Sequence, residues 1–136
     1  MMKAKTLLTS AVMAVLSFVP VAADELVIMH TNDVHGYIDP EKPTDMGGFL
    51  RRKVLVDSIR GAEKHTLLVD AGDAIQGEAI STLTHGEAIV EVMNAAGYDY
   101  ATFGNHEFDY GMDQLLDTIV PAAKYQYLTC NFARLD

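Results

Sequence analysis

The sequence predicts an α/β fold in which helices cover a parallel β-sheet. Short apolar runs bounded by polar residues alternate with longer segments whose apolar residues recur at helical spacing, giving the order β-α-β-α-β-α-β. The connections are short, which suits parallel strands joined by crossover helices. Polar side chains of the metal-binding type follow three of the strands at their carboxyl ends, where parallel sheets place ligand sites.

The first strand and helix are expected in the first sixty residues. Residues 25–30 form a short apolar run that suits a strand buried on both faces. A loop containing Pro40 and Pro43 follows, and a helix is expected over 47–60. Its inner stripe is expected to be Phe49, Leu50, Val54, Leu55 and Ile59, with Arg51, Arg52 and Asp57 on the other side.

Three further strands and two further helices complete the predicted pattern. The strands are expected over 66–70, 100–103 and 125–130, and the helices over 86–96 and 112–123. The inner stripe of the helix over 86–96 is expected to contain Ile89, Val90 and Met93, and Gly97 ends that helix.

Residues 1–23 are interpreted as a signal peptide. Two lysines precede an apolar stretch, Leu7 to Val19, and a small-residue cleavage site precedes Asp24. An uncleaved anchor is the alternative, but the stretch is shorter than the ~20 residues that span a bilayer. We therefore expect a periplasmic or secreted protein without a stable membrane anchor. The single cysteine, Cys130, is expected to be a small core residue.

The chain carries a formal net charge of −9, which constrains its partners. A protein this acidic is a poor binder of nucleic-acid polymers or anionic lipid surfaces. If the substrate is a phosphate, the positive charge must come from something other than lysine. Clustered acidic residues that hold metal ions would supply it.

The polar clusters predict a site for two divalent metal ions. Asp33 and His35 are two positions apart, so in an extended conformation they leave the same face and can hold one ion. Asp73 can bridge that ion and a second one, which Asn105 can bind through its amide oxygen. Carboxylate, imidazole and amide ligands together favour Mn, Zn or Fe over Mg.

The same stretch that contains Asn105 also offers a catalytic pair. His106 is followed three positions later by Asp109, a spacing at which side chains meet across one helical turn. His106 is then free to stabilise developing charge or to protonate the leaving oxygen. Two ions about 3.5–4 Å apart would polarise a phosphoryl group and activate a bound water.

Other interpretations of these residues remain open at this point. Asn32-Asp33 and Gly72-Asp73 are also ordinary turn dipeptides. Asp70 fits a strand end better than a metal ligand. Glu107 and Tyr110 fit either partners of the ligands or, for the acid, the start of a helix.

Three motifs resemble a known family. They are His30-Thr31-Asn32-Asp33-Val34-His35-Gly36, Asp70-Ala71-Gly72-Asp73-Ala74-Ile75-Gln76-Gly77 and Gly104-Asn105-His106-Glu107-Phe108-Asp109-Tyr110-Gly111. They are similar to the first three motifs of the secreted 5'-nucleotidase family of the calcineurin-like metallophosphoesterases. The resemblance implies half of a four-layer metallophosphoesterase sandwich with a dinuclear site. It implies that Asp33 and His35 bind the first ion, Asp73 bridges, Asn105 binds the second ion, and His106 and Asp109 form the catalytic dyad.

The resemblance also sets the expected function and extent. Members of the family continue with motifs that supply further metal ligands and with a domain that stacks the nucleobase, so residues 24–136 are expected to be the N-terminal portion of a truncated catalytic domain. The expected activity is hydrolysis of phosphate esters, with small nucleotides as the favoured substrates. The alternatives are a 2',3'-cyclic-nucleotide phosphodiesterase, a UDP-sugar hydrolase, a thiosulfohydrolase, or a non-catalytic product of a truncated gene.

Overall fold

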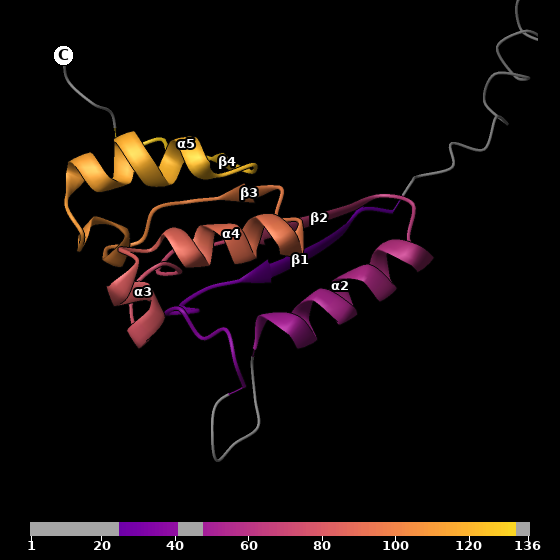
Figure 1. Cartoon of the computed structure of the whole chain (residues 1–136). Helices are drawn as coiled ribbons and strands as arrows, with labels where there is room; N and C mark the ends of the chain where they lie inside the picture. The colour runs from indigo at the N-terminus through magenta and orange to yellow at the C-terminus, as the bar shows by residue number, and fades with distance from the viewer. Residues whose placement is uncertain (1–24, 41–47, 133–136) are drawn as a thin grey trace, which may run out of the picture.

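The described part of the chain forms one parallel four-stranded sheet with helices packed against it (Figure 1). The structure is a computed structural model that describes residues 25–40 and 48–132. Its strand order is sequential, β1-β2-β3-β4, and every neighbouring pair is parallel. The strands are β1 (Val27–Thr31), β2 (Thr66–Asp70), β3 (Tyr100–Ala101) and β4 (Gln126–Tyr127).

The helices form one layer against this sheet. α2 packs against α4, and α4 packs against η2 and α5. Sequential parallel strands joined by right-handed crossovers place their helices on one face, so the described residues form two layers. The predicted α/β class is therefore confirmed. The helical elements are α2 (Phe49–Ala62), α3 (Ala79–Leu83), α4 (Glu87–Ala96), the 3₁₀ turn η1 (His106–Phe108), the π-helical η2 (Gln114–Ile119) and α5 (Val120–Ala122).

The inner stripe and the end of α4 agree with the prediction. Ile89 and Val90 are fully buried and Met93 is 1% exposed. Gly97 ends the helix in a left-handed conformation at φ 80°, and its N–H donates to the Met93 carbonyl at 3.1 Å. This helix lies in the connection between β2 and β3, which pair in parallel.

The predicted inner stripe of α2 is wrong in part. Phe49 is buried, but Leu50 is 77% exposed, and Val54 and Leu55 also face away from the core. Val56 is buried instead. The buried side also includes Arg60, whose guanidinium donates to the Gly97 carbonyl and to the Asp99 carboxylate, each at 2.8 Å. A long basic side chain can lie on the core side when its head group finds such partners, and an apolar pattern does not reveal this.

Several boundaries also differ from the prediction. α3 and η1 were not predicted, and β3 and β4 are each two residues long. Helical residues run from 112 to 122, with η2 in the middle. Cys130 is exposed, which corrects its expected place in the core.

The predicted signal peptide lies outside the described residues. Within the part of the chain that the structure describes, no helix is both long and apolar enough to cross a membrane.

Candidate metal centre

Three of the predicted ligands meet where β1 and β2 end. Asp33 and His35 lie in the loop after β1, and Asp73 lies in the loop after β2. One ligand atom from each residue lies within 4.8 Å of the others. Two carboxylates and an imidazole at this spacing are suitable ligands for one divalent ion.

Backbone hydrogen bonds hold the two loops together beyond the end of the sheet. The Asp33 N–H donates to the Gly72 carbonyl at 3.1 Å, and the His35 N–H donates to the Asp73 carbonyl at 3.0 Å. These bonds continue the β1–β2 pairing, which ends at Thr31 and Asp70. The cluster is therefore built on the sheet rather than on a free loop.

All three cluster residues have left-handed backbone conformations. The φ angles are 50° at Asp33, 47° at His35 and 58° at Asp73. The expected extended conformation between Asp33 and His35 is therefore wrong. Non-glycine residues in this region are uncommon and strained, and they persist when surrounding contacts enforce them. Asp33 and Asp73 do lie in turns, as the alternative interpretation held, and these turns bring the two side chains close to His35.

The orientation of the His35 ring suits metal binding. Its Nδ1 lies 3.1 Å from the Gln76 carbonyl, which can only accept, so Nδ1 carries the proton. Its Nε2 lies 3.8 Å from Asp33 Oδ1 and is therefore the ring nitrogen on the side of the cluster. A ring nitrogen fixed by a backbone carbonyl is the usual partner arrangement of a metal-binding histidine.

The third motif reaches the same place from the end of β3. The His106 N–H donates to Asp73 Oδ1 at 2.8 Å, so Asn105, the preceding residue, is one position from this contact. The approach is close, because a Cβ on Gly104 would collide with the Asp73 side chain. Asn105 is exposed, and no described contact joins its amide to the cluster.

His106 lies next to the cluster and is paired with Asp109. The His106 and His35 rings are 5.2 Å apart at their centroids and meet at 70°. His106 Nδ1 lies 2.7 Å from Asp109 Oδ2. This hydrogen bond raises the pKa of His106 above its ordinary 6.5. The predicted dyad is thus in contact, and its imidazole is within reach of the cluster.

Asp70 is not one of the three cluster residues, but it bonds to residues that lie just before them in the chain. The side chain is 4% exposed and accepts hydrogen bonds from Thr31 Oγ1 at 2.6 Å and from the Gly72 N–H at 2.9 Å. Burial raises the pKa of Asp70 to about 6. Asp70 therefore links the strand before Asp33 to the loop before Asp73, which is more than the strand-end role expected from the sequence.

Glu107 was assigned two alternative roles in the sequence, and its contacts favour the first. It is 1% exposed, and its carboxylate accepts the backbone N–H groups of Asp73 and Ala74 at 2.8 and 2.7 Å. The Tyr110 ring stacks on the His85 ring, with 5.4 Å between the ring centroids. The only indication of this role in the sequence was that Glu107 lies within the third motif, next to His106.

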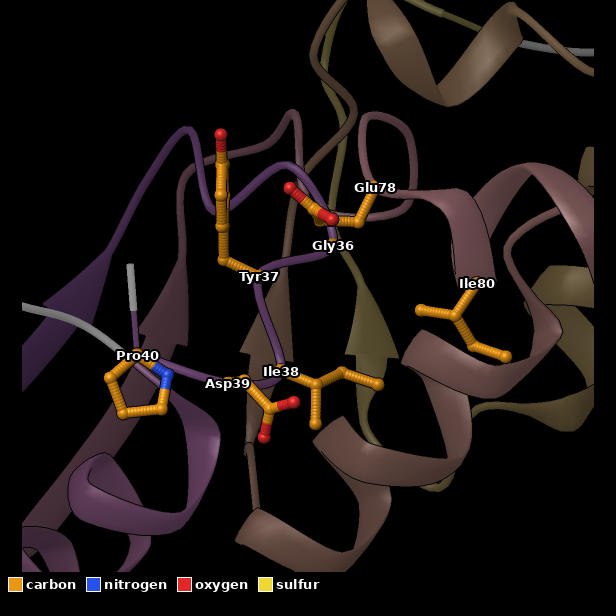
Figure 2. A pocket seen from close by; sticks show the side chains of 7 residues that line it. All are labelled: Gly36, Tyr37, Ile38, Asp39, Pro40, Glu78 and Ile80. Carbon is orange, nitrogen blue, oxygen red and sulfur yellow. The ribbon is translucent and has the colours of Figure 1, made fainter. Parts of the chain in front are cut away.

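A cavity of about 400 Å³ opens beside the cluster (Figure 2). Gly36, which follows His35, forms part of its wall, and the Glu78 N–H donates to the His35 carbonyl at 3.1 Å. Figure 2 shows the Glu78 carboxylate on the same side as the Tyr37 ring. Asp39 adds a second carboxylate to the lining, so a phosphate group would be repelled here unless cations were bound.

Comparison with known proteins identifies the family. The profile of the Calcineurin-like phosphoesterase family matches residues 26–135, which is most of the chain. The chain belongs to the calcineurin-like phosphoesterases. Members of this family are hydrolases that use divalent metals, and Asp33, His35 and Asp73 fit that requirement as a mixed carboxylate and imidazole set.

The most similar relatives include nucleotidases. The chain is 39% identical over 116 residues to the bovine 5'-nucleotidase, covering 79% of this chain and 20% of that protein. It resembles the crystal structure of the 5'-nucleotidase precursor from Thermus thermophilus, with a TM-score of 0.70 and 32% identity, covering 76% and 22%. It also resembles the NAD nucleotidase from Haemophilus influenzae, with a TM-score of 0.70 and 35% identity, covering 76% and 20%. The chain thus spans about a fifth of the length of these relatives.

Proposed function

We propose that this chain carries the first part of a dinuclear metal site that hydrolyses phosphate esters of nucleotides. The observation that carries the proposal is the convergence of Asp33, His35 and Asp73 within 4.8 Å, with the His106 ring 5.2 Å from that of His35. Bound divalent ions would polarise the phosphoryl group and lower the pKa of a bound water. In this proposal Asp33 and His35 hold the first ion, Asp73 bridges, and Asn105 contributes to the second ion.

The residues of the chain have separate tasks in this reaction. The left-handed loops bring the Asp33 and Asp73 carboxylates together before any ion binds, which reduces the reorganisation needed for binding. Asp109 fixes the His106 ring through Nδ1 and leaves Nε2 for the substrate. Because this pairing raises the pKa of His106, a larger fraction carries the proton that the leaving oxygen requires.

Nucleotides are the favoured substrates because of the relatives. The relatives include two 5'-nucleotidases and an NAD nucleotidase, which match 76–79% of this chain. Asp39 and Glu78 line the neighbouring cavity, and their negative charges would repel a phosphate group there unless a metal ion were bound. We therefore propose 5'-nucleotidase-type hydrolysis ahead of the cyclic-nucleotide, UDP-sugar and thiosulfate alternatives.

The test of the metal site is the replacement Asp73→Asn. Asparagine keeps an oxygen that can accept the His106 N–H, but it removes the charge that binds the ion. We expect the affinity of the chain for Mn²⁺ to fall about 100-fold or more, since loss of a residue that merely supports a ligand costs about 10–100-fold. Calorimetric titration with Mn²⁺ measures this change.

The matched control for this test is Asp39→Asn. It removes the same charge from an exposed position near the cluster and outside it, so Mn²⁺ affinity should stay within about twofold, as expected for a screened surface charge. Equal affinity of the wild-type and Asp73→Asn proteins would reject the proposed metal site.

We also propose that the protein is exported. The basic start, the apolar middle and Val21-Ala22-Ala23 occur in the order of a cleavable signal peptide, so we expect cleavage after Ala23. N-terminal sequencing of protein from the extracytoplasmic fraction should then begin at Asp24. Met1 retained on membrane-bound protein is the contrary result.

A further inference from the structure

We propose that Glu107 is a positioning residue for Asp73. Its carboxylate holds the backbone after β2 in the conformation that directs the Asp73 side chain toward His35 and Asp33. The inference rests on the proposed function, because it concerns how the same metal site is built. It adds a residue that neither binds the ion nor touches the substrate.

The Glu107 carboxylate accepts four backbone N–H groups from two separate loops. Oε2 accepts from Asp73 at 2.8 Å and from Gly104 at 2.6 Å. Oε1 accepts from Ala74 at 2.7 Å and from Ile75 at 3.4 Å. Three of the four donors belong to the loop that carries Asp73, and the fourth begins the motif that carries His106. One buried side chain therefore ties the second motif to the third.

These bonds act where the backbone is strained. Asp73 has a φ of 58°, and its N–H is one of the groups that Glu107 accepts. The carbonyl of Asp73 accepts the His35 N–H, and Oδ1 of Asp73 accepts the His106 N–H. The conformation at Asp73 thus decides both where its carboxylate points and how the loops of His35 and His106 meet. Glu107 satisfies the donor that this conformation turns inward.

A carboxylate suits this position better than any neutral side chain of similar size. An ionised carboxylate is an acceptor at both oxygens, with room for about four hydrogen bonds, and all of them are used here. Glutamine has the same shape, but one of the two oxygens is replaced by an NH2 group. That group can only donate, so it cannot accept the two backbone N–H groups that it would face. Either orientation of that amide leaves two backbone donors unsatisfied.

The first test uses the metal-free wild-type protein and needs no substitution. If Glu107 builds the loop before metal binds, the amide protons of Asp73, Ala74 and Gly104 are protected from solvent exchange without any ion. Hydrogen exchange followed by NMR should show at least about tenfold slower exchange than an unstructured peptide at each of them, as expected of bonded groups that open only locally. Unprotected exchange at these amides overturns the proposal.

The second test compares Glu107→Gln with Glu91→Gln, which makes the same change at an exposed position of α4. We expect Glu107→Gln to lower the affinity for Mn²⁺ about 10–100-fold, the usual cost of losing a group that orients a ligand. Glu91→Gln should leave it unchanged. Circular dichroism of both variants reports whether the fold persists.

The outcomes separate this inference from the proposed function. Wild-type Mn²⁺ affinity in a folded Glu107→Gln variant rejects the role of Glu107 and leaves the proposed function standing. A wild-type protein that binds no Mn²⁺ rejects the proposed function, and the exchange measurement then decides alone whether Glu107 organises the loop. The same measurement decides if Glu107→Gln does not fold.

Discussion

Replacing His106 with alanine is expected to leave bound manganese nearly unchanged while lowering turnover of 5'-AMP about 10²–10⁴-fold, the usual contribution of a general acid or base. The imidazole lies beside the cluster and is held by Asp109 at 2.7 Å, so it is placed to act on the substrate rather than to bind the ion. The backbone N–H of His106, which bonds to Asp73, survives the substitution. Metal analysis and phosphatase assays on the same preparation measure the two effects.

Because the chain spans about a fifth of the length of its relatives, the turnover assay uses a longer protein. A suitable one is a chimera in which residues 25–132 of this chain replace the matching segment of the Thermus thermophilus relative, which is 32% identical to 76% of this chain. His30→Ala is the control, because His30 is exposed on β1 and outside the cluster. Loss of manganese in the His106 variant would show that this imidazole is a ligand and that its assigned role is wrong.

The sequence was sufficient to predict the fold class and the meeting of Asp33, His35 and Asp73, whereas no described contact brings the Asn105 amide to them. The fold class follows from the alternation of strand-like and helical segments, and the apolar runs located β2 without error over residues 66–70. The meeting of the loops follows from a second rule, that parallel strands end at the same edge of the sheet. The three motifs therefore had to meet, and the distances among Asp33, His35 and Asp73 agree with this. This prediction required only the approximate positions at which the strands end.

The conformation of the site was beyond the sequence because it depends on contacts between loops. Asp33 and His35 were expected to be extended, but the hydrogen bonds to Gly72 and Asp73 hold them in the left-handed region. Aspartate and histidine adopt this conformation more often than most other non-glycine residues, but the preference is too weak to locate it at Asp33 and His35 from the sequence. The role of Glu107 likewise depends on four donors that come from positions 73 to 75 and 104.

The prediction of which residues of α2 face the core was wrong for a different reason. A helix with apolar residues on two sides has no unique inner stripe, and tertiary partners decide which side is buried. Here Arg60 reaches Asp99 and the Gly97 carbonyl, so the helix turns Val56 inward and leaves Leu50 outside. Contacts of this kind join residues that are about forty positions apart, and local periodicity contains no information on them.

The largest effect is expected when the 136-residue chain is compared with the chimera. Among the described residues, the ligands proposed for the second ion are Asp73 and Asn105, and Asp73 is shared with the first ion. A neutral amide and a shared carboxylate hold a divalent ion weakly in comparison with imidazoles. We therefore expect the chain to bind one Mn²⁺ per molecule and to hold a second one loosely.

Without a firmly bound second ion, the developing charge on the phosphoryl group is only partly stabilised. We expect the chain to hydrolyse 5'-AMP no faster than its own Asp73→Asn variant, even with excess manganese, and the chimera to hydrolyse it at a rate that Asp73→Asn abolishes. Phosphate release with equal concentrations of the four proteins measures this. Fast turnover by the chain alone, lost on Asp73→Asn, would mean that residues not yet identified complete the second site, and metal titration of the chain would then show two tightly bound ions.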